Sequence, residues 1–156
     1  MSVIFVVGSE IMKLDIKLEI EPYQGIAGVR FGMSREQVRH ALNSGVRAFK
    51  KTATDALDTD AFNELGMHVY YKQPDGCEAI ELATPANPTF HGKALIGQPF
   101  NELCDWFKSI DPQIEIDETG LTSFEFGLGL YAALASQLPN TPIEAVIIFQ
   151  QGYYDF

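Results

Sequence analysis

The residues that could perform chemistry are few and widely spaced in this sequence. The histidines are His40, His68 and His91, and the cysteines are Cys77 and Cys104. No histidine stands at metal-ligand spacing from another, and neither cysteine belongs to a CxxC or Cys/His zinc pattern. The sequence therefore predicts no metal site and no bound cofactor.

One set of residues would form an active site if the fold brought it together. His68 falls in a predicted strand near Cys77, and a thiol beside an imidazole is an activated nucleophile. Glu78 and Glu144 occupy corresponding places in an internal repeat described below, and a pair of carboxylates can carry out general acid–base catalysis. These four residues define the alternative to a binding protein, which is a small-ligand binder or hydrolase-like enzyme with a pocket between helices and sheet.

Three aspartates, Asp55, Asp58 and Asp60, lie close together in a polar stretch. Their spacing resembles a calcium loop, but Phe62 stands where a third oxygen ligand belongs and Asn63 where the tight-turn glycine belongs. We therefore interpret the stretch as a solvated polar loop.

Negative charge is concentrated in the last part of the chain. The formal net charge is −10, of which residues 1–96 contribute −2 and residues 97–156 contribute −8. Lys108 is the one lysine or arginine of that second part. Such a field repels nucleic acid and anionic membranes and attracts a basic protein, although acidity also serves solubility alone. We expect a basic protein partner, and neither nucleic acid nor a membrane.

Adjacent tyrosines supply a candidate contact surface. Tyr70 and Tyr71 lie in a predicted strand, so one of the two rings must leave the core face. The same holds for the adjacent pair Tyr153 and Tyr154 near the C-terminus. Tyrosine is favoured at interfaces because it adds contact area with few rotors and a polar tip. Such rings can also lie under a loop or in a homodimer. The predicted partner contacts are Tyr131, Tyr153, Tyr154, Asp117, Glu118 and Glu125.

Hydrophobic periodicity predicts an α+β domain. Ser34 opens a first helix with an S-x-x-Q capping box, and Pro99 begins a second helix with one broad apolar face. Residues 84–92 have the composition of a linker. The predicted strands cover residues 14–20, 29–31, 46–50, 67–72, 77–83, 114–116, 128–133 and 143–149.

The two helix-then-strands segments resemble each other. The helices match at an offset of 65 residues, the next strands at 61 and the last strands at 66. We therefore predict two diverged repeats, residues 26–83 and 92–150, within a single domain of residues 1–156. One helix cannot cover a sheet face alone, so the repeats should share one mostly antiparallel sheet with both helices on one face. The other face is then free or only partly covered.

The first residues do not resemble a targeting segment. The apolar run at residues 3–7 is too short for a signal peptide or a membrane span, and an edge strand explains it better. Residues 1–12 would be an N-terminal extension if Met12 is the natural start. The two cysteines form no disulfide framework, so we expect reduced thiols and a cytoplasmic location.

The stretch GMSREQV at residues 32–38, followed by Leu42, resembles the helix-opening motif of the outer-membrane assembly lipoprotein BamE. It also resembles the tandem units of the β-lactamase inhibitor protein. The chain has neither the lipobox cysteine of the first group nor the paired cysteines of the second. As a whole it resembles small bacterial cytosolic proteins, some of which are encoded in toxin-immunity loci. The resemblance implies a non-catalytic binding protein such as an immunity-type inhibitor, and it supplies no site residues.

Overall fold

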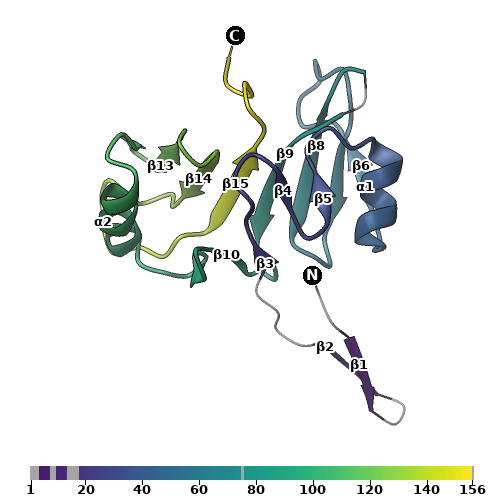
Figure 1. Ribbon diagram of the computed structural model, residues 1–156, viewed down its shortest axis with the longest axis horizontal. Coiled ribbons are helices and arrows are strands. Elements are labelled where there is room, and N and C mark those ends of the chain that lie inside the picture. Colours follow the sequence, from purple (N-terminus) through teal and green to yellow (C-terminus); the bar gives the residue numbers. More distant parts are fainter. Residues whose placement is uncertain (1–3, 8–9, 14–17, 75, 156) are drawn as a thin grey trace.

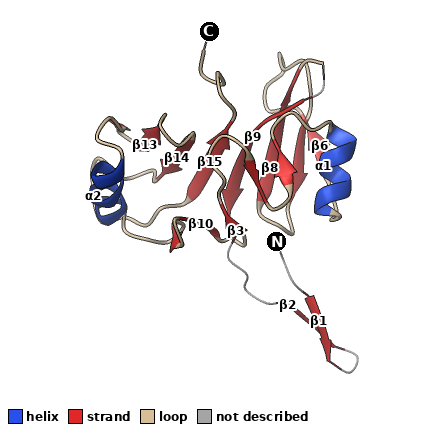
Figure 2. Ribbon diagram, viewed as in Figure 1, coloured by secondary structure: helices blue, strands red, loops and turns tan. Residues whose placement is uncertain are grey.

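The computed structural model describes residues 4–7, 10–13, 18–74 and 76–155. Its main element is an eight-stranded antiparallel sheet in the order β12-β13-β14-β15-β9-β8-β7-β6 (Figure 1; Figure 2). The predicted α+β class with one shared sheet is therefore confirmed. The strands are β6 (Arg47–Phe49), β7 (Thr59–Phe62), β8 (Met67–Lys72), β9 (Gly76–Ala83), β12 (Glu115–Asp117), β13 (Gly120–Ser123), β14 (Leu128–Tyr131) and β15 (Ala145–Phe149).

The two halves of this sheet have the same strand order, and their registers correspond except for a bulge between Tyr70 and Tyr71 in the β8–β9 pair. Helix α1 (Arg35–Leu42) precedes β6–β9, and helix α2 (Phe100–Ile110) precedes β12–β15. At the centre β9 pairs with β15, and Glu81 lies opposite Ile147, the residue 66 positions later. The halves are thus related by a pseudo-twofold axis through this pair. Val69 pairs with Ile80 and Leu130 pairs with Val146, so Val69 and Leu130 take equivalent places in β8 and β14.

The helices begin near the predicted residues. The Ser34 hydroxyl accepts a hydrogen bond from the Gln37 amide at 3.2 Å, and the Gln37 side chain accepts one from the Ser34 amide at 2.9 Å. This confirms the predicted capping box. Asn43 ends α1 in the left-handed conformation. Pro99 stands just before the first turn of α2 rather than inside it.

Both helices belong to the hydrophobic core on one side of the sheet, which we call the inner face. Ile80 and Leu82 of β9, with Val146 and Ile148 of β15, face this side and are buried. Val38 anchors α1 in the same core, and α2 contributes four buried residues to it. The helices lie near opposite ends of the sheet (Figure 1), so helices alone do not cover its middle.

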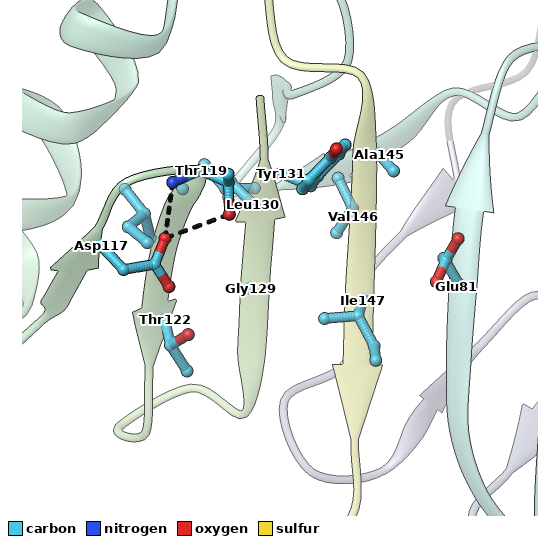
Figure 3. Close-up of a pocket in the computed structure, with 12 residues that line it drawn as sticks. Glu81, Asp117, Thr119, Thr122, Gly129, Leu130, Tyr131, Ala145, Val146 and Ile147 are labelled. Atoms are coloured by element: carbon cyan, nitrogen blue, oxygen red, sulfur yellow. Dashed lines mark hydrogen bonds between the residues drawn. The ribbon is translucent and has the colours of Figure 1, made fainter. Parts of the chain in front are cut away.

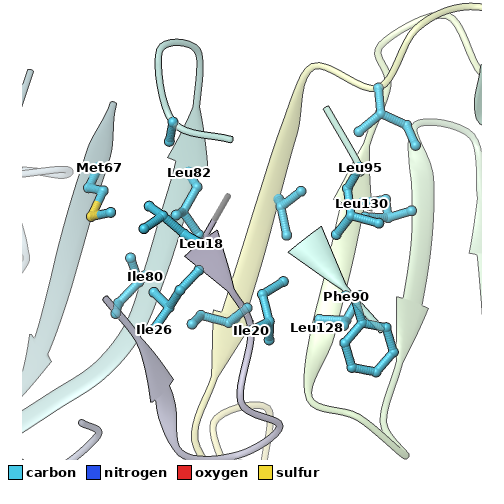
Figure 4. Packing of buried hydrophobic residues seen from close by; sticks show 14 of the residues in the cluster. Leu18, Ile20, Ile26, Met67, Ile80, Leu82, Phe90, Leu95, Leu128 and Leu130 are labelled. Carbon is cyan, nitrogen blue, oxygen red and sulfur yellow. The ribbon is translucent and has the colours of Figure 1, made fainter. Parts of the chain in front are cut away.

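Extended segments cover the middle of the inner face. They carry β3 (Leu18–Glu19), β4 (Gly25–Ile26), β5 (Val29–Arg30), β10 (Pro88–Phe90) and β11 (Lys93–Ala94). Figure 4 shows Leu18, Ile20, Ile26, Phe90 and Leu95 of these segments packing beside the sheet residues. Because β10 pairs with both β3 and β11, the predicted linker at residues 84–92 is part of the core cover.

Two strands of the sheet escape prediction from the sequence. β7 falls at the end of the stretch interpreted as a polar loop, and β13 follows the predicted strand at residues 114–116. Both have four residues and include a type that is depleted in strands, Asp60 in β7 and Gly120 in β13. Each half therefore contributes four strands to the sheet instead of three.

The first described residues form a hairpin of their own. β1 (Ile4–Val7) pairs with β2 (Glu10–Lys13) in a separate two-stranded sheet. The apolar run near the start is therefore not an edge strand of the main sheet. The predicted strand residues Leu14 and Ile16 lie outside the described residues.

A buried ion cluster fastens α1 to the sheet. Asp60 on β7 is 0% exposed and accepts hydrogen bonds from Arg35 at 2.7 Å and from Arg39 at 2.7 and 2.9 Å. The Tyr71 hydroxyl donates to the same carboxylate at 3.0 Å. Burial opposes ionisation of Asp60, but the bonds from Arg39 and Tyr71 and the two guanidinium charges hold its pKa below the usual value. Asp60 is therefore not part of a solvated loop.

We expect Asp60→Asn to lower the free energy of unfolding by about 3 kcal/mol, because it removes the carboxylate that balances two guanidinium groups. The matched control is Asp58→Asn, which breaks an ion pair with Lys50 between half-exposed side chains and should cost less than about 1 kcal/mol. Urea unfolding at neutral pH measures both effects. Similar small losses for the two variants would contradict the assigned role of Asp60.

The Asp60 cluster also predicts a pH dependence. Its folded-state pKa lies below the unfolded value of about 3.9. The stabilisation is therefore complete above that unfolded value and is lost as the pH falls through the folded pKa. The stability difference between the wild type and Asp60→Asn should shrink as the pH is lowered from about 5 to about 2. A difference in urea midpoint that stays constant over this range would refute the assignment.

Candidate functional site

The side of the sheet opposite the helices, which we call the outer face, is partly open. Exposure alternates along the two central strands: Glu81 and Ile147 on the outer face are partly exposed, while Ile80, Leu82 and Val146 on the inner face are buried. Such alternation is typical of a sheet with one face in the core and one facing solvent. The outer face is therefore the place to look for a binding surface.

Directly paired residues form a row across this outer face from one sheet edge to the other. The row has an acid on the edge strand β12 and a base on the edge strand β6. In the first half, the Lys51 ammonium lies 4.5 Å from the centre of the Tyr70 ring. The bases Arg47 and Lys51 therefore lie on the first half of the face, together with the acid Glu81 on β9, and no lysine or arginine stands in the part of the row that belongs to the second half. In order, the row contains Glu115, Thr122, Gly129, Ile147, Glu81, His68, Ala61 and Arg47.

A hollow of about 310 Å³ lies on the second half of the outer face (Figure 3). Its floor is the backbone around Gly129, and its sides include Tyr131 and Ile147. Glu81 and Asp117 lie at its two ends (Figure 3). The Tyr131 side chain is 47% exposed, although Leu130 beside it is buried. The hollow therefore combines an exposed aromatic ring with carboxylates.

The two carboxylates of the hollow have different environments. Asp117 accepts hydrogen bonds from the Thr119 amide at 2.8 Å and from the Thr119 hydroxyl at 3.3 Å. Glu81 accepts one from the Tyr70 hydroxyl at 3.1 Å. Burial and the Glu81 charge raise the pKa of Tyr70, so this hydroxyl keeps its proton and remains a donor. Four strand spacings, about 19 Å, separate the two acids, which therefore cannot share a proton.

The structure brings two of the predicted partner contacts together. Tyr131 and Asp117 line the same hollow, because Tyr131 pairs with Gly120 and Gly120 pairs with Asp117. Glu118 follows Asp117 in the turn and is exposed. Tyr131 and Asp117 therefore line the hollow, and Glu118 is their exposed neighbour in the turn.

The C-terminal tyrosines lie elsewhere on the outer face. Tyr153 packs against Phe149 with ring centroids 5.9 Å apart, in a cluster that also buries Tyr70. Burial, with nearby acids, raises the pKa of Tyr153 to about 12. Tyr154 is 40% exposed and meets Phe149 edge to face at 5.0 Å. Glu125 is exposed in the turn before β14.

These tyrosines lie beside the hollow and do not line it, and Ile147 belongs both to its lining and to the rim of the tyrosine cluster. Phe149 lies four residues along β15 from Ala145, the strand partner of Tyr131, which is a distance of about 13 Å. Tyr70 and Tyr71 point to opposite faces as predicted, but both are buried, at 8% and 7% exposure. Of the six predicted contacts, Tyr131 and Asp117 therefore line the hollow, and the other four do not.

The proposed Cys/His pair does not assemble. Cys77 is fully buried in the core on the inner face. His68 lies on the outer face, where its ring packs edge to face with Phe49 at 5.5 Å. The sheet separates the two side chains, so His68 cannot activate the Cys77 thiol.

The carboxylate pair of the alternative pocket is also wrong. The Glu78 carbonyl accepts a hydrogen bond from the Gln150 amide, just beyond the end of β15. Glu144 immediately precedes the start of the same strand, and its side chain accepts a bond from the Ala133 amide at 2.6 Å. The two acids therefore lie at opposite ends of the β9–β15 pair, roughly 20 Å apart. The four residues do not form a pocket between helices and sheet.

Sequence reasoning missed Glu81, Thr122, Gly129 and Ile147 as residues of the hollow. The sequence held one signal for Gly129: the offset of 61 residues between the predicted repeats aligns it with His68. The lack of a side chain at Gly129 indicates a hollow only once the strand register shows which side chains surround that position.

Comparison with known protein families, with curated proteins and with solved structures finds no match to this chain. Among the described residues, no group of three or more histidine, cysteine or acidic side chains could hold a metal ion. Nor do these residues include a helix that is long and apolar enough to cross a membrane. The geometry of the outer face is therefore the basis for assigning a function.

We expect Cys77 to be unreactive in the folded protein. Burial raises the pKa of this thiol to about 12, so at pH 8 only about one molecule in ten thousand carries the thiolate. Iodoacetamide at pH 8, followed by mass spectrometry, should modify Cys77 in urea and not in buffer. Rapid modification of the native protein would show an accessible thiol and would reinstate the enzymatic alternative.

Proposed function

We propose that this protein is a non-catalytic binding module that docks a basic protein partner on the second half of its outer face. The observation that carries the proposal is the hollow beside Tyr131 and Asp117, on a sheet face opposite both helices. Asp117 and Glu81 line the hollow, and none of its lining residues is a lysine, arginine or histidine. Shape, an exposed ring and charge therefore coincide at one place.

The physical properties of this surface suit protein recognition. An exposed tyrosine such as Tyr131 supplies contact area with little loss of side-chain entropy. Asp117 and Glu118 lie at its edge, where charges steer a partner and set its orientation more than they add affinity. We infer that the rings provide the contact and that the acids select a basic partner.

A more specific form of the proposal is an immunity-type inhibitor that occupies a basic partner in the bacterial cytoplasm. The motif at residues 32–38 supports this form through its resemblance to inhibitor-type tandem units. The two free cysteines fit a reducing compartment. The acidic field disfavours nucleic acid and anionic membranes as partners.

The test uses a display library of random 12-residue peptides selected on the immobilised protein. We expect the enriched peptides to be rich in arginine and lysine and to bind more weakly as salt is raised from about 0.05 to about 0.3 M. Asp117→Asn with Glu118→Gln should weaken the selected peptides by roughly tenfold, because two charges at the edge of the surface are lost.

The matched control removes the same charge from α2. Glu102→Gln with Asp105→Asn changes two exposed acids on a helix that packs on the inner face, and it should leave the peptide affinity unchanged. Enriched peptides without basic residues, or equal losses for the two double variants, would refute the proposal. Light scattering on the free protein measures its oligomeric state. A dimer would favour a second copy of the chain, in place of a basic partner, as the occupant of the outer face.

A further inference from the structure

The hollow exists because the two halves of the sheet fill corresponding positions differently. In the first half, His68 and Phe49 stand on the outer face and pack against each other at 5.5 Å. Strand pairing places Gly129 and Asp117 at the equivalent positions of the second half. A ring pair is thus replaced by a glycine and a carboxylate, and the space over Gly129 stays open.

The chemistry of the hollow fits a cationic side chain with an apolar stem. None of the residues that line it is a lysine, arginine or histidine. Ile147, the strand partner of Gly129, and the Tyr131 ring provide apolar surface between Gly129 and β15. Glu81 lies beyond Ile147 in the same row, and the Tyr70 hydroxyl fixes its Oε2 atom at 3.1 Å.

We propose that this hollow receives an arginine side chain of the basic partner, seated over Gly129 with its guanidinium directed to Glu81. Arginine suits the site better than lysine because its planar group stacks on an aromatic ring and bonds a carboxylate with two parallel donors. Arginine is also enriched among the few residues that dominate binding energy at interfaces. The inference rests on the proposed function, and it identifies an arginine as the partner residue that anchors the complex.

Gly129 offers a direct way to close the hollow. Its backbone is not in the left-handed region, and an added Cβ would meet the Ile147 Cγ2 methyl group at 3.1 Å, so Ile147 must move by a few tenths of an ångström. Gly120 cannot serve, because an added Cβ there would lie 1.9 Å from the Leu130 carbonyl oxygen. Gly129→Leu therefore fills the space over Gly129 at the cost of a small shift of Ile147.

The experiment is a titration of the 15N-labelled protein with N-acetyl-arginine methylamide, followed by amide chemical shifts. We expect the largest shifts at Thr122, Gly129 and Ile147, with dissociation constants of about 1–10 mM for so small a probe. The lysine and norleucine analogues should bind at least about threefold more weakly, since neither has the planar donor group.

Three variants locate the binding. Gly129→Leu should weaken the arginine probe at least about tenfold by filling the hollow, and Glu81→Gln about fivefold by removing the charge at unchanged volume. Gly45→Leu, at an exposed glycine with no atom within 4 Å of an added Cβ, is the matched control and should change nothing. A preserved amide spectrum outside the hollow confirms that each variant is folded.

The outcomes separate this inference from the proposed function. Shifts centred elsewhere, equal binding of the lysine or norleucine analogue, or undiminished binding to Gly129→Leu would overturn the arginine anchor. If the selected basic peptides still bind Gly129→Leu with full affinity, the anchor is wrong and the proposed function stands. If Asp117→Asn with Glu118→Gln leaves peptide binding intact, the proposed function itself fails.

Discussion

The pairing of β9 with β15 is the interaction on which the rest of the structure depends. It joins two four-stranded units into one sheet, with Glu81 opposite Ile147 at the centre. Neither unit has a helix large enough to cover a sheet face alone, so joining them also joins their cores. The same pairing fixes which side chains share the outer face. Both the core and the candidate site therefore follow from one strand register.

The two sides of the joined sheet have opposite requirements. On the inner face, the polar Asp60 is tolerated because two arginines and a tyrosine satisfy its carboxylate completely. On the outer face, Gly129 leaves space unfilled and Tyr131 leaves an aromatic ring in solvent. Stability alone does not favour an open hollow beside an exposed ring, whereas a binding surface uses both. This contrast favours the outer face as the place of the proposed binding surface.

The sequence predicted the elements whose signals are local. The capping box at Ser34 and Gln37, the apolar face of α2 and the strand at Met67–Lys72 depend on neighbours along the chain. The short strand β7 could not be predicted, because aspartate is typical of loops and the sequence does not show that Arg35 and Arg39 bond Asp60 in the fold. The hollow was likewise hidden, since Gly129 gains meaning only from partners in other strands. The predicted His68 and Cys77 pair failed because residues near in sequence fell on opposite faces.

Amide hydrogen exchange tests most directly whether the two units form one continuous sheet that creates the outer face. If they do, the amides of β9 and β15 should share the slowest exchange class and open only with the free energy of global unfolding. If β15 exchanges at a clearly lower free energy than β9, the halves open separately. The shared face and the hollow built on it would then not be properties of the stable fold.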